Sequence, residues 1–174
     1  MKKAFLNFKA FILSQKSKTP NEIGKILLRE AIQISSAESC TGGLISSRLT
    51  DVSGSSAYVR ANFVTYSNEA KHRILNVSED TLKNYGAVSE ECAKEMAQGL
   101  LQLTKSDIVI CTTGVAGPTG SEAKPVGLMY AACGYNGKIT VKKFELNPAY
   151  TRKNMIFMFS EEALKLVLET LKNA

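Results

Sequence analysis

The sequence has few of the residues on which metal and cofactor sites most often depend. Its 174 residues include no tryptophan, one histidine and four cysteines, and no two cysteines form a C-x-x-C pair. Zinc sites draw four ligands mainly from closely spaced cysteine and histidine. We therefore expect no metal and no cofactor. Scattered cysteines of this kind are most simply the reduced thiols of a cytoplasmic protein.

Long apolar runs are also missing, as are acids near the start of the chain. No apolar stretch approaches the roughly 20 residues that span a bilayer, so we expect no transmembrane segment. The formal net charge is +6, and five lysines with no acid lie in the first twenty residues: Lys2, Lys3, Lys9, Lys16 and Lys18. The rest of the chain is almost neutral and does not interleave basic with aromatic residues, which disfavours nucleic acid as a partner.

Residues 1–18 form a basic amphipathic extension ahead of residues 19–174, which we expect to be the functional domain. Apolar residues recur in the extension at roughly helical spacing: Phe5, Phe8, Phe11 and Ile12. Lys9 interrupts the apolar stretch and no small-residue cleavage site follows, which argues against a signal peptide. We expect a helix that packs on the body of the protein or on a second subunit. Attachment to a membrane surface is the alternative.

Helix-like and strand-like segments alternate along the rest of the chain. Helices are predicted from Thr19, as N-cap, to about residue 29, and over about 42–50, 70–75, 89–104 and 149–172, with a short one after Ser78. Strands are predicted near 31–36, 57–66, 107–112, 126–134 and 139–146. The last two strands form a hairpin across Asn136-Gly137. This order predicts an α/β protein, a three-layer α/β/α sandwich around a mixed sheet.

Two segments rich in glycine and hydroxyl side chains each follow a predicted strand. Residues 35–44 read SSAESCTGGL, and residues 113–120 read TGVAGPTG. Ligands of α/β sheets bind beyond the carboxyl ends of the strands, and backbone amides at a helix start attract anions. The two segments therefore predict one site, with Ser39, Cys40 and Thr41 as candidate nucleophiles or oxyanion-loop residues.

A serine nucleophile needs a base, and the sequence offers few. There is no G-x-S-x-G elbow of an α/β-hydrolase. The single histidine, His72, follows Lys71 directly, so we expect it to face away from whatever Lys71 faces. Lysine is the natural substitute base, and both Lys71 and Tyr66 follow a strand that should end near Ser39. Two alternatives stay open: Lys71 on a solvated helix face, and Cys40 as the nucleophile.

Five short motifs occur in register along the chain. They are ESCTGG at 38–43, YSNEAK at 66–71, GAVS at 86–89, TGVAGP at 113–118 and KPVG at 124–127. Over about residues 20–172 they resemble the C-terminal domain family of the competence/damage-inducible protein CinA, which also occurs alone as a nicotinamide-nucleotide amidase. The resemblance implies an α/β/α sandwich, usually a homodimer, that hydrolyses nicotinamide mononucleotide to nicotinate mononucleotide and ammonia without a metal.

The resemblance also implies roles for single residues. Ser39 would be the nucleophile, and Tyr66 and Lys71 would handle protons. A second set would hold the substrate or the oxyanion: Thr41, Gly42, Gly43, Thr113, Gly114, Gly117 and Arg152.

Two departures from the family pattern bear on function. The loop at 120–122 looks one residue shorter than usual, which could alter the fit of a substrate. Pro148 stands where the family has an arginine, so only Arg152 of two arginines is kept. These differences leave open another class of function, a non-catalytic module that binds a nucleotide or a protein partner in competence or the DNA-damage response.

Overall fold

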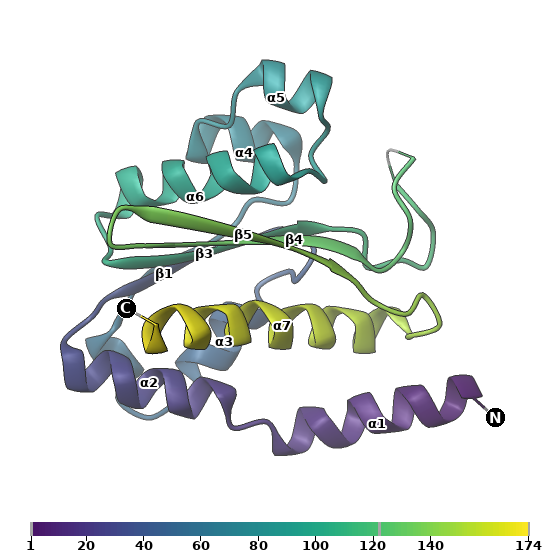
Figure 1. Ribbon diagram of the computed structural model, residues 1–174, viewed down its shortest axis with the longest axis horizontal. Helices are drawn as coiled ribbons and strands as arrows, with labels where there is room; N and C mark the ends of the chain where they lie inside the picture. The colour runs from purple at the N-terminus through teal and green to yellow at the C-terminus, as the bar shows by residue number, and fades with distance from the viewer. Residues whose placement is uncertain (1, 122, 174) are drawn as a thin grey trace.

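Five strands form one mixed sheet in the computed structural model, which describes residues 2–121 and 123–173 (Figure 1). The strands are β1 (Ile34–Glu38), β2 (Val59–Val64), β3 (Ile108–Gly114), β4 (Leu128–Tyr135) and β5 (Lys138–Glu145). Their order is β2-β1-β3-β4-β5; β2, β1 and β3 are parallel, and β4 and β5 continue the sheet antiparallel. The three parallel strands therefore end at the same edge of the sheet.

Helices cover both faces of the sheet, which confirms the predicted α/β/α sandwich (Figure 1). One face carries α4 (Asn68–Leu75), α5 (Glu79–Asn84) and α6 (Glu90–Thr104). The other carries α2 (Thr19–Glu30), α3 (Leu44–Thr50) and α7 (Arg152–Lys172), with α1 (Lys2–Lys16) outermost. A short 3₁₀ turn, η1 (Ser55–Ala57), leads into β2.

The central strand β3 divides the apolar core in two. Side chains alternate between the faces of a strand. Ile108 and Ile110 accordingly pack in the cluster beneath α2, α3 and α7, whereas Val109 and Cys111 pack in the cluster beneath α6. A strand that is buried on both faces reads as a continuous apolar run, which is why it could be predicted from the sequence.

The predicted hairpin is confirmed, but two predicted element starts are wrong. Asn136 and Gly137 have φ of 50° and 74°, as the turn of a two-residue hairpin requires. Strand β1 begins at Ile34 rather than 31, because Ala31 takes φ 52° and ends α2. Thr19 is the first helical residue rather than the N-cap, and its hydroxyl donates to Glu161 instead.

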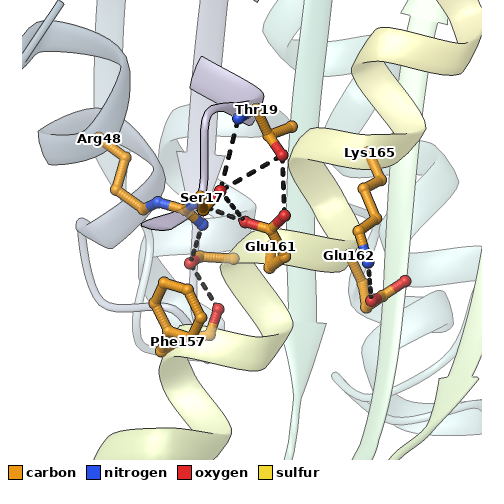
Figure 2. A network of polar contacts seen from close by, with 8 residues as sticks. Ser17, Thr19, Arg48, Phe157, Glu161, Glu162 and Lys165 are labelled. Atoms are coloured by element: carbon orange, nitrogen blue, oxygen red, sulfur yellow. Dashed lines mark hydrogen bonds and ion pairs between the residues drawn. The ribbon is translucent and has the colours of Figure 1, made fainter. Parts of the chain in front are cut away.

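A buried ion pair ties α3 to α7 and to the junction of α1 with α2 (Figure 2). Arg48 Nη2 lies 2.5 Å from Glu161 Oε2, and the two side chains are 11% and 3% exposed. The hydroxyls of Ser17 and Thr19 each donate to the same carboxylate at 2.8 Å. Burial by itself would raise the pKa of Glu161, but the hydrogen bonds from Arg48, Ser17 and Thr19 outweigh it and hold that pKa below its usual value.

Helix α1 packs against α7, but not through the stripe of phenylalanines. Ala10 is its buried residue, with Leu6 and Leu13 half-buried beside it. Phe5, Phe8 and Phe11 stay exposed. The expectation that this helix packs on the body of the protein is therefore confirmed, but a second apolar stripe on the same helix makes that contact.

Candidate active site

Strand β1 is polar, yet all five of its residues are buried. Its hydroxyl groups have partners on neighbouring segments. Ser35 Oγ lies 2.7 Å from Ser106 Oγ, and Ser36 Oγ donates to Asn62 Oδ1 at 2.9 Å. Because each hydroxyl is hydrogen-bonded, the strand can carry polar side chains into the core and present more of them where it ends.

The side chains of Glu38 and Ser39 point to opposite faces of the sheet, as alternation along an extended chain requires. The Glu38 carboxylate accepts hydrogen bonds from the amides of Gly43, Ile45 and Ser46 at 3.0, 3.0 and 2.8 Å, at the start of α3. Ser39 points instead to the face that carries α4 and Lys71. A carboxylate of the chain itself therefore occupies the N-terminus of α3.

The amides of the first glycine turn are already used within the chain. Gly42 N donates to the Ser39 carbonyl at 3.1 Å, and Gly43 N donates to Glu38. The hydroxyl of Thr41 lies 2.8 Å from that of Thr112. The role of residues 41–43 in holding a substrate or oxyanion stays a prediction.

Lys71 is joined to Ser39 in the interior of the protein. The Lys71 side chain is 1% exposed, and its Nζ donates to Ser39 Oγ at 3.1 Å and to the Thr65 carbonyl at 2.9 Å. Ser67 caps α4 by accepting from the amide of Ala70, which starts the helix just after β2. The end of β2 and the first turn of α4 thus bring the amine to the hydroxyl. The alternative of a solvated Lys71 is wrong.

Tyr66 is placed differently from Lys71. Its side chain is 62% exposed, and its hydroxyl accepts a hydrogen bond from Arg152 Nη2 at 3.1 Å. Arg152 also donates to the carbonyl of Gly117. The hydroxyl to which the resemblance assigns a proton-handling role is therefore joined to Arg152 in this structure.

A pocket of about 370 Å³ lies between the Ser39 turn and the second glycine-rich loop. Its lining includes six of the residues named above: Cys40, Tyr66, Lys71, Gly114, Gly117 and Arg152. Thr113 is buried beside it, and its hydroxyl donates to the carbonyl of Ala87 at 2.7 Å. Five of the predicted site residues therefore line the pocket, and two more lie next to lining residues: Thr113 precedes Gly114, and Ser39 is hydrogen-bonded to Lys71.

The remaining three predicted residues, Thr41, Gly42 and Gly43, line a separate apolar groove of about 750 Å³. Phe11 and Phe157 line its other side. Arg152 contributes to both the pocket and the groove, because it stands at the start of α7 between them.

Two rival residues are less suited to catalysis than Ser39, although Cys40 lines the pocket. Cys40 is 6% exposed, and burial raises the pKa of its thiol to about 12. Since the thiolate is the nucleophilic form, a neutral Cys40 is a weak candidate beside Ser39. His72 Nδ1 lies 2.8 Å from the Val77 carbonyl, and its Nε2 lies 3.8 Å from Glu79, so the ring faces the start of α5.

Two contacts around the site were not predicted from the sequence. The role of Glu38 was missed, although a carboxylate placed shortly before a helix start is a signal for an N-terminal cap. The Arg152–Tyr66 contact joins residues 86 positions apart and has no local signal. The loop at 120–122, expected to be short, includes Glu122, which lies outside the described residues.

Within residues 2–121 and 123–173, no helix is long and apolar enough to cross a membrane. Over the same ranges, no group of three or more His, Cys, Asp or Glu side chains is placed to hold a metal ion.

The fold and the site define a class, an α/β/α domain with a serine–lysine pair at the ends of parallel strands. Comparison with known proteins identifies the family. Residues 16–171 match the family model described as the CinA C-terminal domain. A "CinA-like protein" of Chloroherpeton thalassium is 49% identical over 152 residues, which are 86% of this chain and 36% of that protein. The chain belongs to the CinA C-terminal domain family and spans about a third of the length of such curated relatives.

Solved structures of the same superfamily share the fold. The competence/damage-inducible protein CihA from Agrobacterium tumefaciens aligns with a TM-score of 0.83 at 35% identity, covering 90% of this chain and 97% of that one. The competence damage-inducible protein A (ComA) from Klebsiella pneumoniae aligns with a TM-score of 0.85 at 31% identity, covering 89% and 96%. These names describe a biological context and state no reaction.

Proposed function

We propose that this protein is an amidohydrolase that converts nicotinamide mononucleotide to nicotinate mononucleotide and ammonia. The observation that carries the proposal is the buried amine of Lys71, 3.1 Å from the hydroxyl of Ser39, at the edge of a pocket. A serine hydroxyl is a weak nucleophile until a base removes its proton, and a lysine amine in its neutral form can be that base. The family resemblance supplies the substrate.

The chemistry proceeds in two halves. Ser39 Oγ attacks the carboxamide carbon while Lys71 takes the hydroxyl proton. That proton passes to the leaving nitrogen, so ammonia departs and an acyl ester remains on Ser39. Water then attacks the ester, Lys71 again takes a proton and returns it to Ser39, and the carboxylate product leaves.

The other residues of the pocket fit a substrate that carries a phosphate. Arg152 places a cationic group at the pocket beside Tyr66, and a guanidinium is suited to phosphate oxygens. Gly114 and Gly117 contribute main chain to the lining of the pocket. We also propose that the protein works as a homodimer, as the family resemblance implies, and in the cytoplasm, which suits its scattered cysteines.

An ammonia-release assay on a panel of amides tests the proposal. We expect turnover of nicotinamide mononucleotide, and a fall of at least about 10⁴-fold in kcat for Ser39→Ala. Mass spectrometry of the enzyme quenched during turnover should find the acyl group on the peptide that carries Ser39. Lys71→Met should also lose turnover, and its thermal unfolding shows whether it folds.

Matched variants make the result specific. Cys40→Ala should retain activity, and so should Lys83→Met, which removes an exposed lysine from α5. Full activity in Ser39→Ala with loss in Cys40→Ala would transfer the nucleophile role to Cys40. Mononucleotide binding by calorimetry with no ammonia released at high enzyme concentration would instead identify a non-catalytic nucleotide-binding module.

A further inference from the structure

Helix α1 is held on the domain through one face only. Asn7 Oδ1 accepts from the amide of Thr151 at 2.8 Å, and Asn7 Nδ2 donates to the carbonyl of Ala149 at 3.1 Å. Asn154 Nδ2 donates to Asn7 Oδ1 at 2.8 Å, and Ala10 is 2% exposed on the same side. These contacts fix the rotation of the helix about its axis, so its opposite face points away from the domain.

The outward face of α1 is both aromatic and basic. Phe5 and Phe8 are 59% and 60% exposed. At 3.6 residues per turn, Lys9 and Lys16 fall within the same arc of about 100° as these two rings. The amine of Lys9 lies 4.5 Å from the centroid of the Phe5 ring. Single exposed apolar side chains are ordinary, but neighbouring phenylalanines on one helix face mark an interaction surface.

The positive charge of this surface favours a negatively charged partner. Residues 1–18 hold five lysines and no acid, and the rest of the chain is almost neutral. We propose that α1 docks the protein on an anionic membrane surface, with Phe5 and Phe8 entering the boundary of headgroups and acyl chains and the lysines facing the lipid phosphates. Basic amphipathic helices with aromatic residues on the apolar face bind in this way, in the plane of the interface.

A bilayer suits the face better than a second copy of the chain does. A two-fold contact through α1 would set the four lysines of that helix against four identical charges, and like charges repel at close range. A lipid surface supplies negative charge and an apolar layer together. The proposed homodimer would therefore form through another face. The match to the family model begins at residue 16, so α1 lies almost wholly outside the matched range.

Co-sedimentation of the full chain with vesicles tests the docking surface. The probes are vesicles of phosphatidylcholine alone and vesicles with about a quarter of phosphatidylserine, which carry the negative surface potential that attracts lysines. We expect binding to the anionic vesicles only, and weaker binding as salt rises. Each lysine near such a surface strengthens binding by about fivefold, so Lys9→Gln/Lys16→Gln should weaken it by about 25-fold.

Phe5→Ser/Phe8→Ser should weaken vesicle binding by at least about tenfold. Matched controls lie on the opposite side of the sheet, where Leu103 and Tyr85 are 51% and 52% exposed. Leu103→Ser/Tyr85→Ser and Lys83→Gln/Lys94→Gln should bind vesicles like the parent. All four pairs change exposed side chains, so thermal unfolding and amide hydrolysis should stay unchanged.

Three results would overturn the membrane proposal. The first is no sedimentation with anionic vesicles. The second is equal binding to both lipid compositions, or equal losses in the α1 and control variants. The third is a change in oligomeric state on size exclusion for Phe5→Ser/Phe8→Ser without any vesicle binding, which would assign the face to a second copy of the chain.

Discussion

Removing the charge of Glu161 should destabilise the protein strongly, because it leaves Arg48 buried without its counter-ion. In Glu161→Gln the new side chain still accepts hydrogen bonds, so the loss reports mainly on the charge. Breaking a buried pair from one side costs about 3–5 kcal/mol. For a domain of this size that corresponds to a fall in Tm of about 6–20 °C. Chemical denaturation monitored by circular dichroism measures the free energy directly.

The loss of unfolding free energy in Glu161→Gln should depend on pH in a defined direction. The folded-state pKa of Glu161 lies below the ordinary 4.5, so the folded state favours the ionised carboxylate. The stability gap between parent and Glu161→Gln is therefore full above about pH 4.5 and shrinks as the pH falls through the folded pKa. A gap that stayed constant down to the acid limit of folding would refute this account.

Two comparisons separate the charge from the packing. Glu162→Gln removes the next carboxylate on α7, whose partner Lys165 is 45% exposed, and should cost less than about 1 kcal/mol. Arg48→Met/Glu161→Leu replaces both charges by apolar groups and should recover much of the loss. If the double variant were as unstable as Glu161→Gln, the lost stability would come from the packing of the site rather than from the unpaired guanidinium.

Three further changes have definite expected outcomes. Glu38→Gln should lower the free energy of unfolding by about 1–2 kcal/mol, because three amides at the start of α3 lose a charged acceptor. Gly99→Ala should cost about 3 kcal/mol or more, because a Cβ there would lie 1.7 Å from the Leu75 carbonyl oxygen. Cys40 should resist alkylation by iodoacetamide at pH 8 until the protein unfolds, because burial raises its pKa to about 12.

Each of these expectations has a contrary result. An unchanged denaturation midpoint in Glu38→Gln would mean that the amides of α3 find another acceptor. Gln98→Ala is the matched control for Gly99→Ala, since it alters an exposed neighbour on the same helix. Equal stability of those two variants would show that α4 moves away from α6 without cost. Alkylation of native Cys40 at the rate of a free thiol would exclude the buried, neutral form.

Local signals predicted most of the architecture. The apolar run 107–112 is typical of a strand covered on both faces, and Asn136-Gly137 is typical of the turn of a hairpin. Because the ends of parallel strands meet at one edge, the order of the elements placed Ser39 and Lys71 at the same edge, with a solvated Lys71 as the open alternative. Those features depend on chain periodicity and strand direction, which the sequence contains.

Features that depend on competition between long-range contacts were not predictable in this way. Helix α1 has two apolar stripes, and only the fit of Asn7 and Ala10 to α7 decides which stripe packs. The hydroxyl of Tyr66 reaches Arg152 because the start of α7 lies near the segment that follows β2, a tertiary contact with no local signal in the sequence. Thr19 looked like a cap, yet a buried carboxylate on a distant helix attracts its hydroxyl more strongly than the helix start does.

The opposite orientations of Glu38 and Ser39 have a consequence for how this turn can change in evolution. A single inserted or deleted residue next to either position would exchange the faces that they serve. The carboxylate would then point toward Lys71, and the hydroxyl toward the start of α3. Substitutions at 39–43 leave this alternation of faces intact, whereas a change in the length of the segment does not. The exposed residues just after Pro118 line the pocket, so a change of length there would alter the shape of the pocket without exchanging the faces that Glu38 and Ser39 point to.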